Sequence, residues 1–190
     1  EASEEPDSFP EVQGIAEGLQ RSQRSGQFRL EQRLVTSPRE IQRAMLDVEP
    51  QILHFVGAVG NQGLVFADQS GNAQPITGTA LAGLFALFAD QVQCVVLNGC
   101  YAQLQAQAMA EQVPAVIGMS AAIGNEAAME FAVSFYDALG AGRPLEFAYK
   151  LGRSALQLSG IAEHLLPVLL QSGLESVTEA TPTAPPAPTP

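Results

Sequence analysis

Apolar and polar positions along this chain follow two periods, one typical of helices and one typical of strands. Apolar residues recur every three or four positions in residues 11–25, which predicts an amphipathic helix. Further helical patterns cover residues 77–88, 102–111, 125–139 and a last segment that ends near residue 158. Short, nearly all-apolar runs occupy residues 52–56, 92–98 and 114–119. Such runs are typical of parallel strands covered on both faces, so the alternation predicts an α/β fold with a mainly parallel sheet between helices.

Local signals refine this outline between the longer patterns. Residues 37–40, SPRE, form a capping box with proline at the first helical position, which predicts a helix that Pro50 ends. Residues 28–35 alternate in part like a strand with one buried face. Residues 64–67 and a strand around residues 75–76 flank DQSGN, which predicts a hairpin.

The two ends of the chain differ from the middle in composition. Residues 1–10, EASEEPDSFP, are expected to form a flexible acidic lead-in, and residues 11–175 a single folded domain. Residues 176–190 are rich in Pro, Thr and Ala, which predicts a disordered tail or linker. We therefore expect a module of a larger protein.

Charge is distributed unevenly and restricts the choice of partner. The net charge is −11, yet six of the nine basic residues lie between Arg21 and Arg43, and residues 44–142 contain no Lys or Arg. Such a surface repels phosphate backbones and anionic lipid, so we expect no nucleic-acid partner. No apolar run approaches the ~20 residues of a membrane-spanning helix, so we expect no membrane insertion. We interpret the basic segment as a solvated face, with contact to an acidic partner as the alternative.

The spacing of the two cysteines indicates the redox environment of the protein. A strand between Cys94 and Cys100 would place them roughly 20 Å apart, too far for a disulfide. Two thiols without a histidine-rich neighbourhood form no zinc site, and we expect no metal and no cofactor. Reduced thiols favour a cytoplasmic location.

Loops after the carboxyl ends of strands hold the chemistry of open α/β sheets, and two such loops are candidates here. Cys100 lies just beyond a buried strand and near a helix start, where a thiolate is stabilised, although a small buried hydrophobe is the alternative. The other loop, residues 57–63, GAVGNQG, has no group that exchanges a proton. It also lacks the Lys and Ser/Thr of a phosphate loop.

Two sequence stretches, VVLNGCYA and FAVSFYDALGAGR…FAYKLG, resemble the CHAT domain, a caspase-like peptidase domain often found after tetratricopeptide repeats in bacteria. The resemblance runs from about Gln27, and more faintly from the first helix, to about Leu169. It implies a caspase-like three-layer α/β/α sandwich and makes Cys100 the nucleophile position.

The active pattern of that family reads H-F-S-G-H-G, and its second histidine is the catalytic base. In this chain His54 matches the first histidine and Gly57 the glycine, so that Ala58 occupies the position of the base. Val59 replaces the next glycine, and the loop is about one residue shorter. The resemblance thus implies an active-site loop without its chemistry.

Three hypotheses of function follow from this resemblance. The first is a pseudo-peptidase, a catalytically impaired domain that binds or scaffolds protein partners, with its oligomeric state open. The second is an active cysteine endopeptidase that uses Cys100 with a base from elsewhere. His54 is expected in the sheet and His164 on the surface, outside any motif match, so neither is the expected base. The third is a domain that regulates the other domains of a longer protein.

Overall fold

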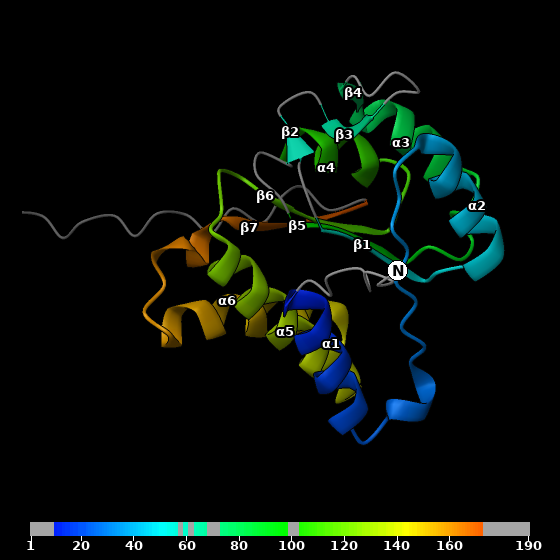
Figure 1. The fold of residues 1–190 in the computed structure, drawn as a ribbon. Coiled ribbons are helices and arrows are strands. Elements are labelled where there is room, and N and C mark those ends of the chain that lie inside the picture. Colours follow the sequence, from blue (N-terminus) through cyan, green and yellow to red (C-terminus); the bar gives the residue numbers. More distant parts are fainter. Residues whose placement is uncertain (1–9, 57–58, 61–62, 68–72, 99–102, 173–190) are drawn as a thin grey trace, which may run out of the picture.

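A computed structural model describes residues 10–56, 59–60, 63–67, 73–98 and 103–172 of the chain. These residues form three layers, with a four-stranded sheet between two groups of helices (Figure 1). Helices α1 (Pro10–Arg21), α5 (Asn125–Gly140) and α6 (Leu145–Leu158) cover one face. Helices α2 (Pro38–Val48), α3 (Gly78–Ala86) and α4 (Gln103–Ala110) cover the other. The α/β/α sandwich predicted from the sequence is confirmed.

The main sheet has the order β1-β5-β6-β7. Strands β1 (Ile52–Val56), β5 (Cys94–Asn98) and β6 (Ala115–Met119) are parallel, and β7 (Pro167–Gln171) pairs antiparallel with β6. Every residue of β5 and β6 is buried, as their apolar sequences predict. Residues 52–56 form the predicted parallel strand, but they were expected to be covered on both faces, whereas β1 lies at the edge of this sheet and is only half-buried. Strand β7 was not predicted.

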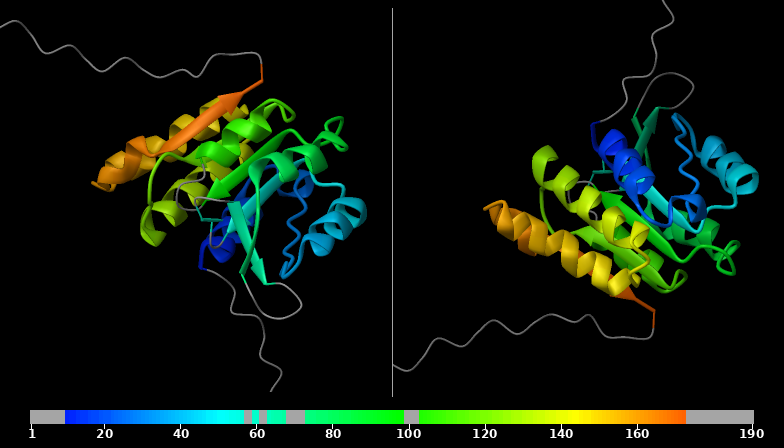
Figure 2. Two further views of the ribbon diagram at one scale, coloured as in Figure 1. Left: turned by 90° about the horizontal axis from the view of Figure 1, so that it is seen from above. Right: turned by 90° about the horizontal axis from the view of Figure 1, so that it is seen from below.

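Helices α1, α5 and α6 form one layer under the sheet (Figure 2, view from below), and glycines lie at their contacts. A Cβ added to Gly14 of α1 would lie 2.7 Å from Val133 of α5, and one added to Gly152 of α6 would lie 2.8 Å from the ring of Phe131. The core of this layer contains Phe131 and Phe135, which stack with ring centroids 6.0 Å apart. Side-chain bulk at these glycines would therefore force the helices apart.

The opposite layer begins with the capping box that the sequence predicts. Ser37 is the N-cap of α2, and its backbone N–H donates to the Glu40 carboxylate at 3.0 Å. Glu49 ends the helix in a left-handed conformation with φ of 50°. At the start of α3 the Thr77 hydroxyl accepts from the backbone N–H of Ala80 at 3.2 Å, as expected of an N-cap. These caps satisfy N–H groups that the first turn leaves without partners.

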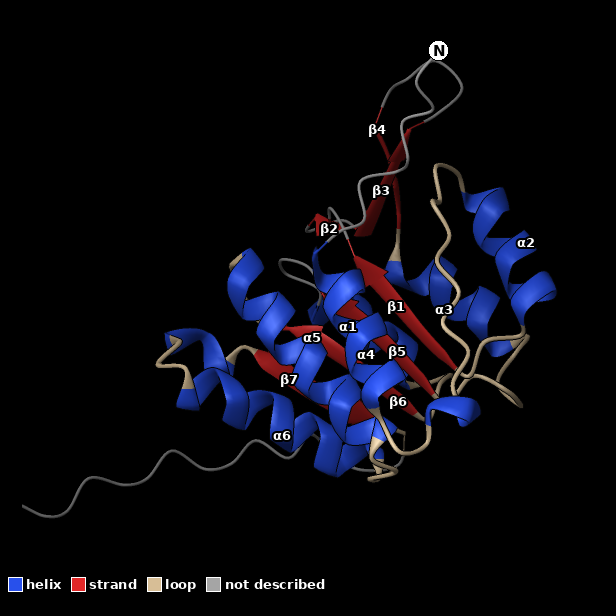
Figure 3. Cartoon of the chain, turned by 60° about the horizontal axis from the view of Figure 1, so that its bottom comes forward, coloured by secondary structure: helices blue, strands red, loops and turns tan. Residues whose placement is uncertain are grey.

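A second, three-stranded sheet follows β1 in the chain (Figure 3). Strands β2 (Val59–Gly60), β3 (Gly63–Ala67) and β4 (Ala73–Ile76) are antiparallel and project beyond the carboxyl end of β1. The pairing of β3 with β4 confirms the predicted hairpin, and its turn residues 68–72 lie outside the described residues. The short η2 helix (Ala162–Leu165) leads into β7.

Residues 28–36, here called the crossing segment, differ from the prediction. Helix α1 ends at Arg21 instead of residue 25, and the short η1 helix (Ser25–Gln27) precedes the crossing segment. The segment is extended but pairs with no strand in the described residues, so the strand predicted at residues 28–35 is wrong. Phe28 packs on the core below the sheet and Val35 on the core above it. The segment therefore crosses the β1 edge from one helical layer to the other instead of running alongside the strand (Figure 1).

None of the helices in the described part of the chain is both long and apolar enough to span a bilayer.

Candidate functional site

The two candidate loops leave neighbouring strands of the sheet. Val56, the last residue of β1, pairs with Asn98, the last residue of β5. Ala58 and Cys100 each follow two residues later and lie outside the described residues. The strands that lead to both positions are thus adjacent, parallel and in register, as two loops that share one site require.

A buried polar cluster lies at this end of the two strands. Asn98 is 5% exposed, and its Nδ2 donates to the backbone carbonyl of Ala128 in α5 at 3.0 Å. The same Nδ2 makes a short hydrogen bond to Oε1 of Glu11. Asn98 Oδ1 has no partner within the described ranges. The side chain of Asn98 therefore links the end of β5, just before the Cys100 loop, to α1 and α5, two helices of the same layer.

Glu11 brings a carboxylate into this apolar layer from the first turn of α1. It is 8% exposed, and its Oε1 also lies 3.1 Å from Nε2 of His54. Its position in the first turn places the carboxyl group at the positive end of the α1 dipole. Glu11 therefore connects α1 to both strands that lead to the candidate loops.

The ring of His54 is enclosed on the α1 and α5 side of the sheet. It stacks on Tyr136 of α5 with ring centroids 5.6 Å apart and planes 15° from parallel, and its side chain is 11% exposed. Its Nε2 faces Glu11, and its Nδ1 has no hydrogen-bond partner in the described part of the chain. His54 is a buried histidine of the sheet, as the sequence predicts, and its contacts with Glu11 and Tyr136 hold it there.

Burial also controls the protonation of two other groups in this layer. It raises the pKa of the Cys94 thiol, at the start of β5, to about 12. It raises the pKa of the Tyr136 hydroxyl as well, with smaller contributions from Cys94 and Glu11. A thiol that stays protonated in this way is unreactive, so Cys94 has no nucleophilic role at neutral pH.

His164 lies at the other edge of the sheet, in η2 next to β7. Its ring Nδ1 is 3.3 Å from the carbonyl of Ile161, and Nε of Arg153 donates to the His164 carbonyl at 3.0 Å. Strand β6 separates β7 from β5. The partly exposed position agrees with the surface histidine predicted from the sequence.

Glu11 and Asn98 were not predicted from the sequence as members of a cluster. A signal for Glu11 was present, because it shares one helical face with Ile15 and Leu19, both buried. A carboxylate on the apolar face of an amphipathic helix needs a buried partner. Asn98 gave no such signal, since an asparagine at a strand end is common in turns.

The residues that the structure describes contain no group of three His, Cys, Asp or Glu side chains that could hold a metal ion. The family model of the CHAT domain matches residues 2–160. No curated protein matches the chain.

Proposed function

This chain belongs to the CHAT family, a caspase-like family, and on that premise we propose that it is a pseudo-peptidase that acts as a protein-binding or scaffolding module. We place the folded domain at residues 11–175 and a linker at residues 176–190, within a larger protein. The proposed setting is bacterial and cytoplasmic, where both thiols stay reduced.

One observation carries this proposal: Ala58 stands where the active pattern has its catalytic histidine. A methyl side chain takes no proton, so the thiol of Cys100 has no base from this position. The differences at Val59 and in loop length support drift of the whole loop after loss of use. The register of Val56 with Asn98 supports the pairing of the two loops.

The contacts of His54 argue against a relocated base. Its Nε2 faces the Glu11 carboxylate, and its ring is stacked on Tyr136 within the sheet layer. A general base needs hydrogen-bond reach to the proton that it accepts. To serve Cys100, His54 would have to leave both partners, and Glu11 would stay buried without the imidazole that faces it, which is costly.

An active cysteine endopeptidase is the second candidate, and the retained Cys100 favours it. Cysteine depends least of all nucleophiles on a base, because a few per cent is thiolate at neutral pH. A base supplied by a partner would complete such a site. Loss of a catalytic partner nevertheless typically costs several orders of magnitude in rate.

Incubation of the domain with a broad peptide library tests the proposal, with cleavage products followed by mass spectrometry. We expect no turnover that differs between wild type and Cys100→Ser. Cleavage that is present in the wild type and absent in Cys100→Ser would overturn the pseudo-peptidase and establish the endopeptidase.

A further inference from the structure

A pocket lies between α1 and the start of the crossing segment. It has a volume of about 370 Å³ and is lined by Ala16, Leu19, Gln20, Ser25, Phe28 and Leu30. Apolar side chains form most of this lining, and Leu30 remains 46% exposed. The volume lies at the lower end of the range of ligand pockets, which suits one large apolar side chain of a partner.

The segment that runs from the end of α1, past this pocket, into α2 carries the opposite charge to the rest of the chain. Residues 21–43 contain six arginines and two glutamates, so this stretch carries +4, while the rest of the chain carries −15. Three of the arginines directly neighbour lining residues, since Arg21 follows Gln20, Arg24 precedes Ser25 and Arg29 follows Phe28. A field of this sign attracts carboxylates.

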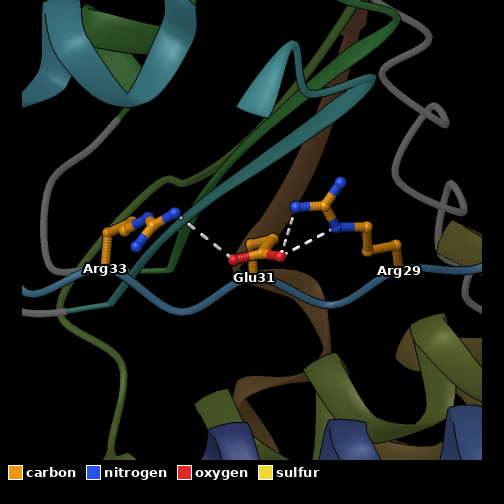
Figure 4. Close-up of polar contacts among 3 residues, drawn as sticks. All are labelled: Arg29, Glu31 and Arg33. Atoms are coloured by element: carbon orange, nitrogen blue, oxygen red, sulfur yellow. Dashed lines mark hydrogen bonds and ion pairs between the residues drawn. The ribbon is translucent and has the colours of Figure 1, made fainter. Parts of the chain in front are cut away.

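Carboxylates of the described residues neutralise these arginines only in part. Arg29 and Arg33 share the single carboxylate of Glu31, at 2.7 and 3.5 Å (Figure 4). The hydrogen bond from Arg29 lowers the pKa of Glu31, which therefore stays ionised at neutral pH. Within the described ranges, no carboxylate pairs with Arg21 or Arg24. Residues 16–33, which contain the whole pocket lining, thus carry four arginines against Glu17 and Glu31, a net charge of +2.

The backbone next to the pocket also has free hydrogen-bonding capacity. No backbone N–H or C=O of residues 29–35 bonds to another described residue. Leu34 is 73% exposed, so the outer part of the crossing segment is accessible. An extended partner segment can pair with such backbone groups while its side chains enter adjacent pockets.

We propose that this surface binds an acidic peptide segment of a partner protein. One large apolar side chain of the peptide fills the pocket between α1 and Phe28, and its carboxylates face Arg21, Arg24 and Arg29. This inference rests on the proposed protein-binding function and names the chemistry of the partner. A nucleic acid is disfavoured because the −15 on the rest of the chain repels a phosphate backbone.

The test uses an array of nine-residue peptides with six Glu or Asp positions and one Leu, Phe or Met. Fluorescence anisotropy of labelled peptides measures their affinity for the intact chain. Matched peptides carry Lys for the acidic residues or Gln for the apolar one. We expect binding only when both features are present, with an affinity that falls as salt is added.

Variants of the chain then locate the binding site. The double charge reversal Arg21→Glu with Arg24→Glu should weaken binding at least about tenfold. Ala16→Phe, which fills the pocket, should abolish binding of the apolar anchor. Lys150→Gln on α6 is the matched control and should leave the affinity unchanged. Circular dichroism of each variant confirms folding, which distinguishes a filled pocket from an unfolded chain.

Several outcomes would overturn the docking proposal. These are an absence of acidic-peptide binding at millimolar concentration, a preference for Lys-rich or neutral peptides, and affinities that both variants leave unchanged. Displacement of the peptides by a twelve-nucleotide oligothymidylate at lower concentration would indicate a nucleic-acid surface instead. A peptide affinity that is the same in wild type and in both variants refutes this site but not the proposed protein-binding function. Cleavage that depends on Cys100 refutes the pseudo-peptidase proposal but not the proposed peptide-binding site.

Discussion

A single buried carboxylate organises the end of the sheet where the candidate loops begin. Oε1 of Glu11 contacts both Nδ2 of Asn98 and Nε2 of His54, which come from adjacent strands. Desolvation of a carboxylate is costly, so its stabilising value depends on these partners. Through His54 and Asn98, the cluster holds α1 against β1 and β5, the two strands from which the candidate loops begin.

Replacement of Glu11 separates this role from simple packing. Glu11→Ala should lower the free energy of unfolding by about 3 kcal/mol, because the buried Asn98 loses a hydrogen-bond acceptor and His54 loses the carboxylate that faces its Nε2. Glu11→Gln keeps an oxygen acceptor and should cost about 1 kcal/mol. Urea denaturation measures both values. Glu17→Ala, on the exposed face of the same helix, is the control and should change little. Equal stabilities of Glu11→Ala and wild type would show that the cluster does not hold α1.

Secondary structure was predictable where the local sequence decides it. The capping box at Ser37 and the apolar run of β1 gave these elements their correct starts, because caps and periodicity act within a few residues. The crossing segment was mistaken for a strand, since alternation predicts extended backbone but not the partner that completes a ladder. Strand β7 was missed because its five residues form a strand only through long-range pairing with β6.

Two helical glycines should respond in opposite ways to alanine. A Cβ at Gly152 would lie 2.8 Å from the fully buried ring of Phe131 and 3.0 Å from its carbonyl, so Gly152→Ala should destabilise the domain by about 1–3 kcal/mol. A Cβ at Gly83 in α3 meets nothing within 4 Å, so Gly83→Ala should stabilise by about 0.5–1 kcal/mol through helix propensity. Thermal denaturation of both variants checks this. Stabilisation by both would mean that α5 and α6 pack more loosely than described.

The α2 cap should depend on pH in a defined direction. Hydrogen bonds from the backbone N–H of Thr36 at 2.6 Å, and from its hydroxyl at 3.0 Å, lower the pKa of Glu40 from its ordinary 4.5. A lowered pKa in the folded state contributes stability that is fully present above pH 4.5 and is lost as the pH falls through the lowered value. Wild type should therefore exceed Glu40→Gln in urea midpoint at pH 7, and the difference should be smaller at pH 3. A difference that is the same at both pH values would contradict this assignment.

At the scale of the whole molecule, the sequence predicted the position of the candidate site but not the helix that covers it. The candidate site was predicted to lie between the loops after residues 52–56 and 94–98, and those strands are adjacent. The helix that covers this end could not be assigned, since the contact of Glu11 with Asn98 joins residues 87 positions apart. Residues 21–43 carry +4 and the rest of the chain carries −15, so the segment between α1 and α2 differs in charge from the rest of the sequence. A caspase-like fold with a positively charged segment fits the proposed binding module.

The central claim is that the thiol of Cys100 has no imidazole partner. The alkylation rate of Cys100 with iodoacetamide, measured by mass spectrometry from pH 5 to pH 10, tests this most directly. Cys94 is the internal reference and should remain unmodified, because burial raises its pKa to about 12. Three proteins are compared: wild type, Ala58→His, and a graft of an active-type loop over residues 56–62.

We predict a wild-type rate that rises through about pH 8, as for an ordinary or mildly stabilised thiol. Ala58→His should change the profile little, because Val59 and the shorter loop misplace the ring, and a misplacement near 1 Å can cost about a hundredfold. The loop graft should move the profile to lower pH, since a nearby imidazolium favours the thiolate. A wild-type rate that is already maximal below pH 6.5 would contradict the account, because it would require a base that pairs with Cys100 from elsewhere in the chain.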